Sequence, residues 1–158
     1  MIRVEPLTAE AFAPFGDVIE VDPSRAFDIN DGFTTRNHAL ARVQSQAGAI
    51  LSIFEGRVRP LSVAMVECHP LGSQAFVPLN GQDWLAVVAG TPEPAACRAF
   101  LCKGTQGLQY NTGVWHHPLL VLDGAQNFLV VDRDGKDDQD NRANLREVFF
   151  EQPLEIML

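Results

Sequence analysis

Short apolar segments separated by Gly and Pro recur along the chain and predict a protein built mainly from β-strands. Each segment is about five residues long and rich in Val, Ile, Leu and Phe, as is typical of strands. No long segment has apolar residues at the spacing of an amphipathic helix. The predicted strands cover residues 17–21, 50–54, 61–67, 74–78, 84–89, 98–102, 119–122, 128–132 and 146–150.

One short helix is predicted near the start of the chain. Thr8 can cap it, the following residues to Ala13 favour it, and Pro14 ends it. Residues 42–49 offer a possible second helix start. Many short strands without intervening helices favour a sandwich or barrel over a parallel α/β fold. With 158 residues, we expect one all-β domain over 1–158, an antiparallel barrel with a short N-terminal helix.

The charge balance restricts the partners of this protein. Twelve Lys and Arg stand against 20 Asp and Glu, a formal net charge of −8, which argues against a nucleic-acid surface. Five of the acidic residues fall within 132–140, where we expect a solvated loop, with Asp132 and Arg133 as a structural pair at a strand end.

Two further features bear on location. No apolar segment has the length of a membrane span or of a signal-peptide core, so we expect neither insertion nor export. The three cysteines, Cys68, Cys97 and Cys102, form no CxxC motif. We therefore expect reduced, buried thiols in a cytoplasmic protein.

The candidate catalytic and metal-binding residues include histidines and their neighbours in the sequence. Glu67 and His69 are two residues apart, so on a strand their side chains point to the same face. A turn at 71–72 would let Gln74 meet them. His116 and His117 are adjacent, so only one of them can face the same interior. Two imidazoles, a carboxylate and an amide oxygen suit a divalent transition metal; alternatively, the histidines are hydrogen-bonded residues of the core.

The spacing of these residues resembles the paired motifs of the cupin superfamily, HxHxxxxE and PxGxxH. Glu67 stands in place of the first His, Gln74 in place of the Glu, and Asn111 in place of the Pro. The two stretches are Glu67-x-His69-x4-Gln74-x6-Gly81 and Asn111-x-Gly113-x2-His116. They leave His69 and His116 as the matched ligands, and a cupin-type jelly roll as the implied fold.

A closer resemblance covers essentially the whole chain. The strings HPLGxQAFxP at 69–78 and GVWHHPL at 113–119, with shorter matches at 15–20, 27–32, 98–100 and 132–133, resemble the bacterial ureidoglycolate lyase family. The resemblance implies a homodimer that splits (S)-ureidoglycolate into glyoxylate and urea in allantoin breakdown. It also implies a divalent metal cofactor, nickel in particular.

From these motifs we predict the roles of individual residues. Glu67 and His116 would transfer protons, and a metal would be held by His69, His116, Glu67 and Gln74. Arg36 would bind the substrate carboxylate through two parallel hydrogen bonds, with Lys103 as the alternative cation. The remaining predicted substrate contacts are His38, Gln74, Tyr110 and Trp115.

Two other functions fit the same fold. One is a metal-dependent cupin isomerase or dioxygenase, although oxygen activation favours two His and one carboxylate facing open positions. The other is a non-catalytic module that binds a small carboxylic acid. Formation of glyoxylate from ureidoglycolate distinguishes both from the lyase.

Overall fold

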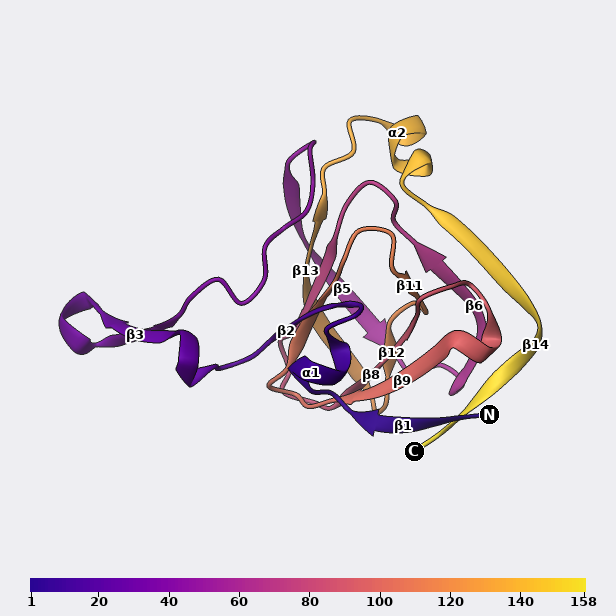
Figure 1. Ribbon diagram of the computed structural model, residues 1–158, viewed down its shortest axis with the longest axis horizontal. Helices are drawn as coiled ribbons and strands as arrows, with labels where there is room; N and C mark the ends of the chain where they lie inside the picture. Colours follow the sequence, from indigo (N-terminus) through magenta and orange to yellow (C-terminus); the bar gives the residue numbers. More distant parts are fainter.

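Two β-sheets face one another and enclose the apolar interior (Figure 1). The computed structural model describes residues 1–158. The larger sheet has seven strands in the order β11-β6-β14-β1-β9-β8-β12. Its strands are β1 (Ile2–Pro6), β6 (Ser62–Cys68), β8 (Trp84–Ala89), β9 (Cys97–Cys102), β11 (Trp115–His116), β12 (Leu120–Val121) and β14 (Arg146–Met157).

The smaller sheet has five strands in the order β2-β10-β7-β13-β5. Its strands are β2 (Gly16–Ile19), β5 (Ala49–Arg57), β7 (Gln74–Pro78), β10 (Gly107–Tyr110) and β13 (Ala125–Arg133). All pairings in this sheet are antiparallel. In the larger sheet β1 runs parallel to both β9 and β14. The predicted all-β barrel is confirmed, with this parallel strand as an addition.

Strand β8 explains how the interior is organised. All of its residues are buried, which accounts for the unbroken apolar run WLAVVA. Alternate side chains point to opposite faces. Trp84, Ala86 and Val88 therefore join one apolar cluster with Phe12 and Phe128. The intervening residues, Leu85, Val87 and Ala89, join a second cluster that includes Val63, Val66 and Leu120.

The helices are short. The predicted first helix is α1 (Ala9–Phe12), where the Thr8 hydroxyl accepts a hydrogen bond from the Ala11 amide at 3.1 Å. The prediction of a loop over 132–140 is wrong in part, because α2 (Asp138–Ala143) forms there with an Asp137 cap. Residues 42–49 contain no helix. None of the helices is long and apolar enough to cross a membrane.

Asp132 and Arg133 do not pair with each other. Asp132 instead contacts Gln74, whose Nε2 donates a hydrogen bond to Asp132 Oδ2 at 3.1 Å. Arg133 instead makes two hydrogen bonds to Asp140, at 2.8 and 2.9 Å. Successive residues of β13 point to opposite sides, so adjacent side chains cannot face one another.

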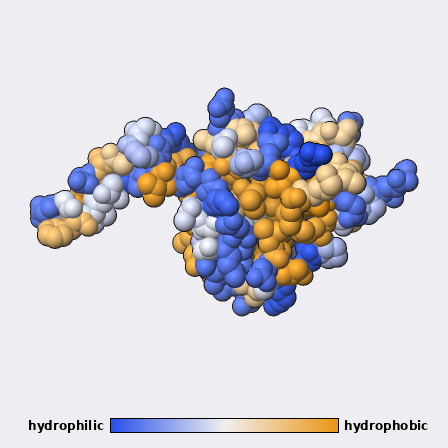
Figure 2. Space-filling model, turned by 90° about the horizontal axis from the view of Figure 1, so that it is seen from below, coloured by the Kyte–Doolittle hydropathy of each residue, from blue (hydrophilic) through white to orange (hydrophobic).

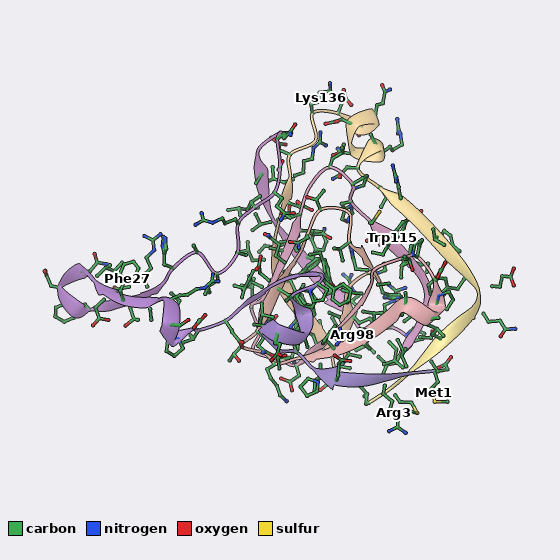
Figure 3. The ribbon with its side chains drawn as sticks, in the orientation of Figure 1. Met1, Arg3, Phe27, Arg98, Trp115 and Lys136 are labelled. Carbon is green, nitrogen blue, oxygen red and sulfur yellow. The ribbon has the colours of Figure 1, made fainter.

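A two-stranded hairpin, which we call the arm, stands outside both sheets. Its strands are β3 (Ala26–Ile29) and β4 (Thr34–Asn37), and they pair only with each other. The arm projects from the body (Figures 1 and 2). Two aromatic side chains are exposed on it: Phe27 at 47% (Figure 3) and Phe33, at the turn, at 92%.

Candidate functional site

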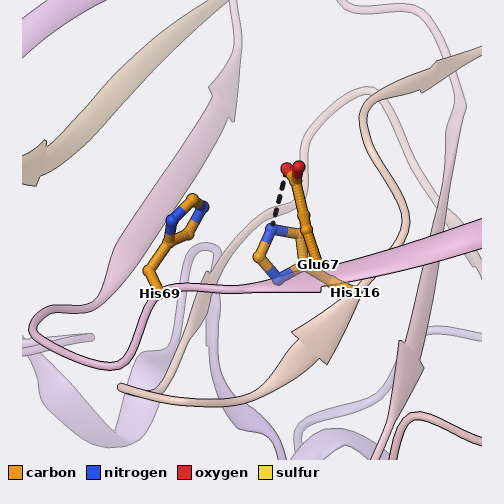
Figure 4. Close-up of side chains that lie close together, drawn as sticks. All are labelled: Glu67, His69 and His116. Atoms are coloured by element: carbon orange, nitrogen blue, oxygen red, sulfur yellow. Dashed lines mark ion pairs between the residues drawn. The ribbon is translucent and has the colours of Figure 1, made fainter. Parts of the chain in front are cut away.

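Glu67, His69 and His116 come together at one place in the interior (Figure 4). Glu67 on β6 lies directly opposite His116 on β11 in an antiparallel pairing, so their side chains are cross-strand neighbours. His69 follows β6, two residues beyond Glu67. One potential ligand atom from each residue lies within 4.8 Å of the others, and the two imidazole centroids are 5.2 Å apart.

Each histidine of this cluster is held by a backbone carbonyl group. His69 Nδ1 lies 2.9 Å from the Asn144 carbonyl oxygen, and His116 Nδ1 lies 3.0 Å from that of Val114. A carbonyl oxygen only accepts, so both Nδ1 atoms must carry hydrogen and donate. In the neutral imidazole this leaves the lone pair on Nε2. Both lone pairs are therefore available inside the cluster.

The free ring nitrogens make this cluster a credible metal site. Nε2 of His69 and Nε2 of His116 are buried and have no hydrogen-bond partner, an arrangement that is costly unless a ligand completes it. Metal-bound histidines usually donate their other ring nitrogen to a carbonyl or carboxylate group, as both do here. Two imidazoles and a carboxylate are ligands that a divalent transition metal accepts. The residues present thus fit a metal.

Glu67 carries the charge of the cluster. Burial raises its pKa, but the interaction with the His116 imidazole, whose Nε2 lies 3.6 Å from Glu67 Oε1, outweighs burial, and His69 and His117 add to the lowering at acid pH, where imidazoles become protonated. The net effect is a Glu67 pKa below its usual value. At neutral pH the side chain is an ionised carboxylate that can accept a proton or bind a cation.

Burial and the nearby charge of His116 lower the pKa of His69, against the opposing effect of its hydrogen bond to Asn144. His69 is therefore uncharged near neutral pH. This is the form in which an imidazole binds a metal.

Gln74 is buried beside the cluster on β7. Its amide nitrogen donates to Asp132, which leaves the amide oxygen free. Asp132 was not predicted to belong to the site. Its position there results from the pairing of β13 with β7, which residue spacing alone does not reveal.

The two predicted aromatic contacts have different positions. The Tyr110 ring stacks on His116 with centroids 4.3 Å apart and an interplanar angle of 12°, so it lies behind the imidazole and fixes its plane. Trp115 packs against the second apolar cluster, because neighbouring residues of β11 face opposite ways. Trp115 therefore does not form a wall of the site, contrary to the prediction.

His117 does not join the cluster. It is buried, its Nδ1 lies 2.7 Å from the Pro118 carbonyl oxygen, and burial is the main cause that lowers its pKa to about 4. The choice between the two adjacent histidines is thereby resolved in favour of His116.

A cavity of about 380 Å³ opens onto the cluster, within the usual range for small-molecule sites. Glu67, Gln74 and His116 form part of its wall, and two arginines that the sequence analysis missed, Arg57 and Arg59, form another part. In the sequence, both arginines lie in the short connection between the predicted strands 50–54 and 61–67, and this position was the one indication available. The remaining lining residues are Phe54, Glu55, Gly56, Phe76, Pro118 and Leu119.

The three other predicted polar contacts lie elsewhere in this chain. Arg36 is on β4 and His38 follows it, so both belong to the exposed arm or its base. Neither of them lines the cavity. Lys103 pairs with Asp83 at 3.0 Å. The sequence pattern of the arm gave no indication that it stands away from the barrel.

Comparison with known proteins identifies the family of this chain. Residues 1–157 match the family model described as ureidoglycolate lyase. A ureidoglycolate lyase of Brucella melitensis biotype 2 is 51% identical over 94% of this chain and 89% of its own. One from Pseudomonas paraeruginosa is 49% identical over 99% of this chain and 95% of its own.

Among solved structures, one of oxalate decarboxylase matches with a TM-score of 0.40 and 14% identity over 92% of this chain. This chain spans 30% of that protein. The full-length match to the family model and the relatives at about half identity are decisive. The chain belongs to the ureidoglycolate lyase family.

Proposed function

We propose that this protein cleaves ureidoglycolate into glyoxylate and urea, and that the Glu67–His69–His116 cluster is where the reaction takes place. Family membership supports the activity. The observation that supports the location is the pair of buried, unpartnered Nε2 atoms beside an ionised carboxylate. Among groups of three or more His, Cys, Asp and Glu residues, this is the one whose potential ligand atoms lie within 4.8 Å of one another.

The reaction requires one proton to change place. The reacting carbon of ureidoglycolate carries a hydroxyl, a carboxylate and the ureido nitrogen. When the carbon–nitrogen bond breaks, the hydroxyl loses its proton, its oxygen becomes the carbonyl oxygen of glyoxylate, and the departing nitrogen takes up a proton to give urea. A positioned acid or base typically contributes about 10²–10⁴-fold to such a step.

Glu67 is the residue we propose to accept the hydroxyl proton. Its lowered pKa keeps it ionised at neutral pH, and it lines the cavity beside His116. The same carboxyl group then carries the proton that the nitrogen needs. His116, fixed by the Val114 carbonyl group and by stacking on Tyr110, lies beside this carboxylate, with its Nε2 3.6 Å from Glu67 Oε1.

A divalent metal would be held by His69 and His116, with Glu67 and the Gln74 amide oxygen beside them. Such an ion lowers the pKa of a coordinated hydroxyl and orients the substrate. We propose nickel as its identity, as the family resemblance implies. Measuring the metal content of the purified protein tests this choice.

We further propose that the chain is a single domain that acts as a cytoplasmic homodimer. Edge strand β5 supports dimerisation, because an exposed apolar edge is normally protected by a partner. Its exposed residues are Ile50, Leu51, Ile53 and Phe54. The three free cysteines fit a reducing compartment. A monomer at micromolar concentration in sedimentation would contradict the dimer.

The decisive experiment is a glyoxylate assay with racemic ureidoglycolate. We expect release well above the spontaneous rate, supported by nickel or manganese after removal of bound metal. Release at the spontaneous rate under all of these conditions would instead favour a module that only binds a small carboxylic acid.

A further inference from the structure

The active-site cavity poses an electrostatic problem for an anionic substrate. The Glu67 carboxyl group lines this cavity beside His116. A substrate carboxylate placed here without a cation would be repelled by Glu67. Arg57 and Arg59 are the cations that line this cavity, so the counter-charge supplied by this chain must come from one or both.

The two arginines are not equivalent. Arg57 ends β5, and its Nη1 donates to the Glu55 carbonyl oxygen at 3.5 Å. Arg59 lies beyond the strand, next to Val58, which forms an isolated bridge with Val121. The Arg59 guanidinium makes no hydrogen bond or ion pair within the chain. All five of its donors are therefore available to a ligand.

Arg59 and the cluster belong to the wall of one cavity. Arg59 lines this cavity together with Glu67 on β6 and His116 on β11. A small acid that spans from the cluster to Arg59 would place its reacting carbon near Glu67.

We propose that Arg59 binds the carboxylate of the substrate through its guanidinium, in place of the predicted Arg36. This inference rests on the proposed function for the identity of the acid. The chemistry it requires is a short 2-hydroxy acid, because the hydroxyl belongs at the Glu67–His cluster while the carboxylate reaches Arg59. A planar guanidinium matches a carboxylate with two parallel hydrogen bonds.

The test compares Arg59→Gln with Arg59→Lys and with a matched control, Arg142→Gln on α2. Binding of glycolate, which has the hydroxyl and the carboxylate but no leaving group, is measured by calorimetry beside its neutral amide, glycolamide. We expect Arg59→Gln to weaken glycolate binding about 10- to 100-fold, with Arg59→Lys intermediate. Glycolamide binding should be unchanged, and the control should behave as the wild type.

Turnover gives an independent result. We expect Arg59→Gln to raise KM for ureidoglycolate about 10- to 100-fold with kcat changed much less, since the carboxylate contact is similar in the ground and transition states. Equal weakening of glycolate and glycolamide would indicate a merely structural role and overturn the proposal. So would unchanged glycolate binding and KM, or a KM effect in Arg36→Gln instead. If the wild type released no glyoxylate, the proposed function would fail while glycolate binding still tested Arg59.

Discussion

The barrel interior and the arm each carry polar side chains typical of active sites, yet their surroundings differ. In the interior, His116 is 2% exposed, held by the Val114 carbonyl group and stacked on Tyr110. On the arm, Arg36 and His38 are exposed, and the two strands pair only with each other. A two-stranded hairpin alone is marginally stable in water.

The difference shows what a site requires beyond suitable residue types. A catalytic group must be fixed by its neighbours to within a fraction of an ångström. Backbone carbonyl groups, strand register and a stacked ring do this for the interior histidines. The arm, whose two strands pair only with each other, gives Arg36 and His38 no such support.

The largest expected effect separates the two regions directly. His116→Ala should abolish glyoxylate release, by at least about 10³-fold, because it removes both a proposed metal ligand and the partner of Glu67. Circular dichroism should show that the variant is folded. His38→Ala should retain activity within about twofold.

Either of two results would break this comparison. Full activity in His116→Ala would show that the reaction does not use the cluster. A large loss in His38→Ala, restored by mixing with a variant inactive in the cluster, would mean that the arm completes the site of a partner.

The next largest effect is the dependence of the free energy of unfolding on pH. His117 keeps a pKa of about 4 in the folded protein against 6.5 for an ordinary histidine. Between these values the unfolded chain binds more protons, so the free energy of unfolding should fall as the pH drops from about 6.5 to 4. The loss is roughly 3 kcal/mol, and the lowered pKa of His69 acts in the same direction.

Urea denaturation at pH 7 and pH 4.5 measures this loss. His117→Asn should show a smaller difference between the two pH values, because it removes the buried titrating group. His38→Asn on the arm is the matched control and should keep the wild-type dependence. An unchanged pH dependence in His117→Asn would contradict the assigned cause.

Metal binding should give a stabilisation of similar size. A metal at 100 times its Kd stabilises the folded state by about 2.7 kcal/mol. We expect nickel to raise the melting temperature of the wild type and to have little effect on His69→Ala. An equal rise in both proteins would place the bound metal elsewhere.

The smallest effect is expected on the arm. Phe33 is 92% exposed, so Phe33→Ser should change the free energy of unfolding by less than about 0.5 kcal/mol. Phe12 is fully buried, and Phe12→Ala should cost about 3–5 kcal/mol. Chemical denaturation of both variants measures the contrast. A large loss in Phe33→Ser would mean that the arm is packed against another copy in solution.

Much of the fold was predictable because its central strands are strongly apolar. The predicted strands at 74–78 and 84–89 coincide with β7 and β8. Strands β1, β3, β4, β10 and β11 were missed. They are short or carry polar residues, and they become strands through pairing with distant segments. For β11 the partners are β6 and β8.

The site was predictable to a similar extent. Glu67, His69, Gln74 and His116 were recognised because their spacing follows a known motif, and they do lie together. Arg59 and Asp132 were missed, since nothing in their local sequence links them to the histidines. Arg36 was predicted because its segment resembles the family. That resemblance does not reveal that the segment forms the arm and projects away from the cavity.

The sequence by itself determined the family, the β-rich architecture and the residue types of the cluster, because these depend on local apolar patterning and on motif spacing. Only the tertiary structure decided which of His116 and His117 enters the site, which ring nitrogens are free, and which arginines line the cavity. Each of these depends on cross-strand register and on backbone groups distant in sequence, such as the Asn144 carbonyl group at His69. Such contacts arise only when the chain is folded.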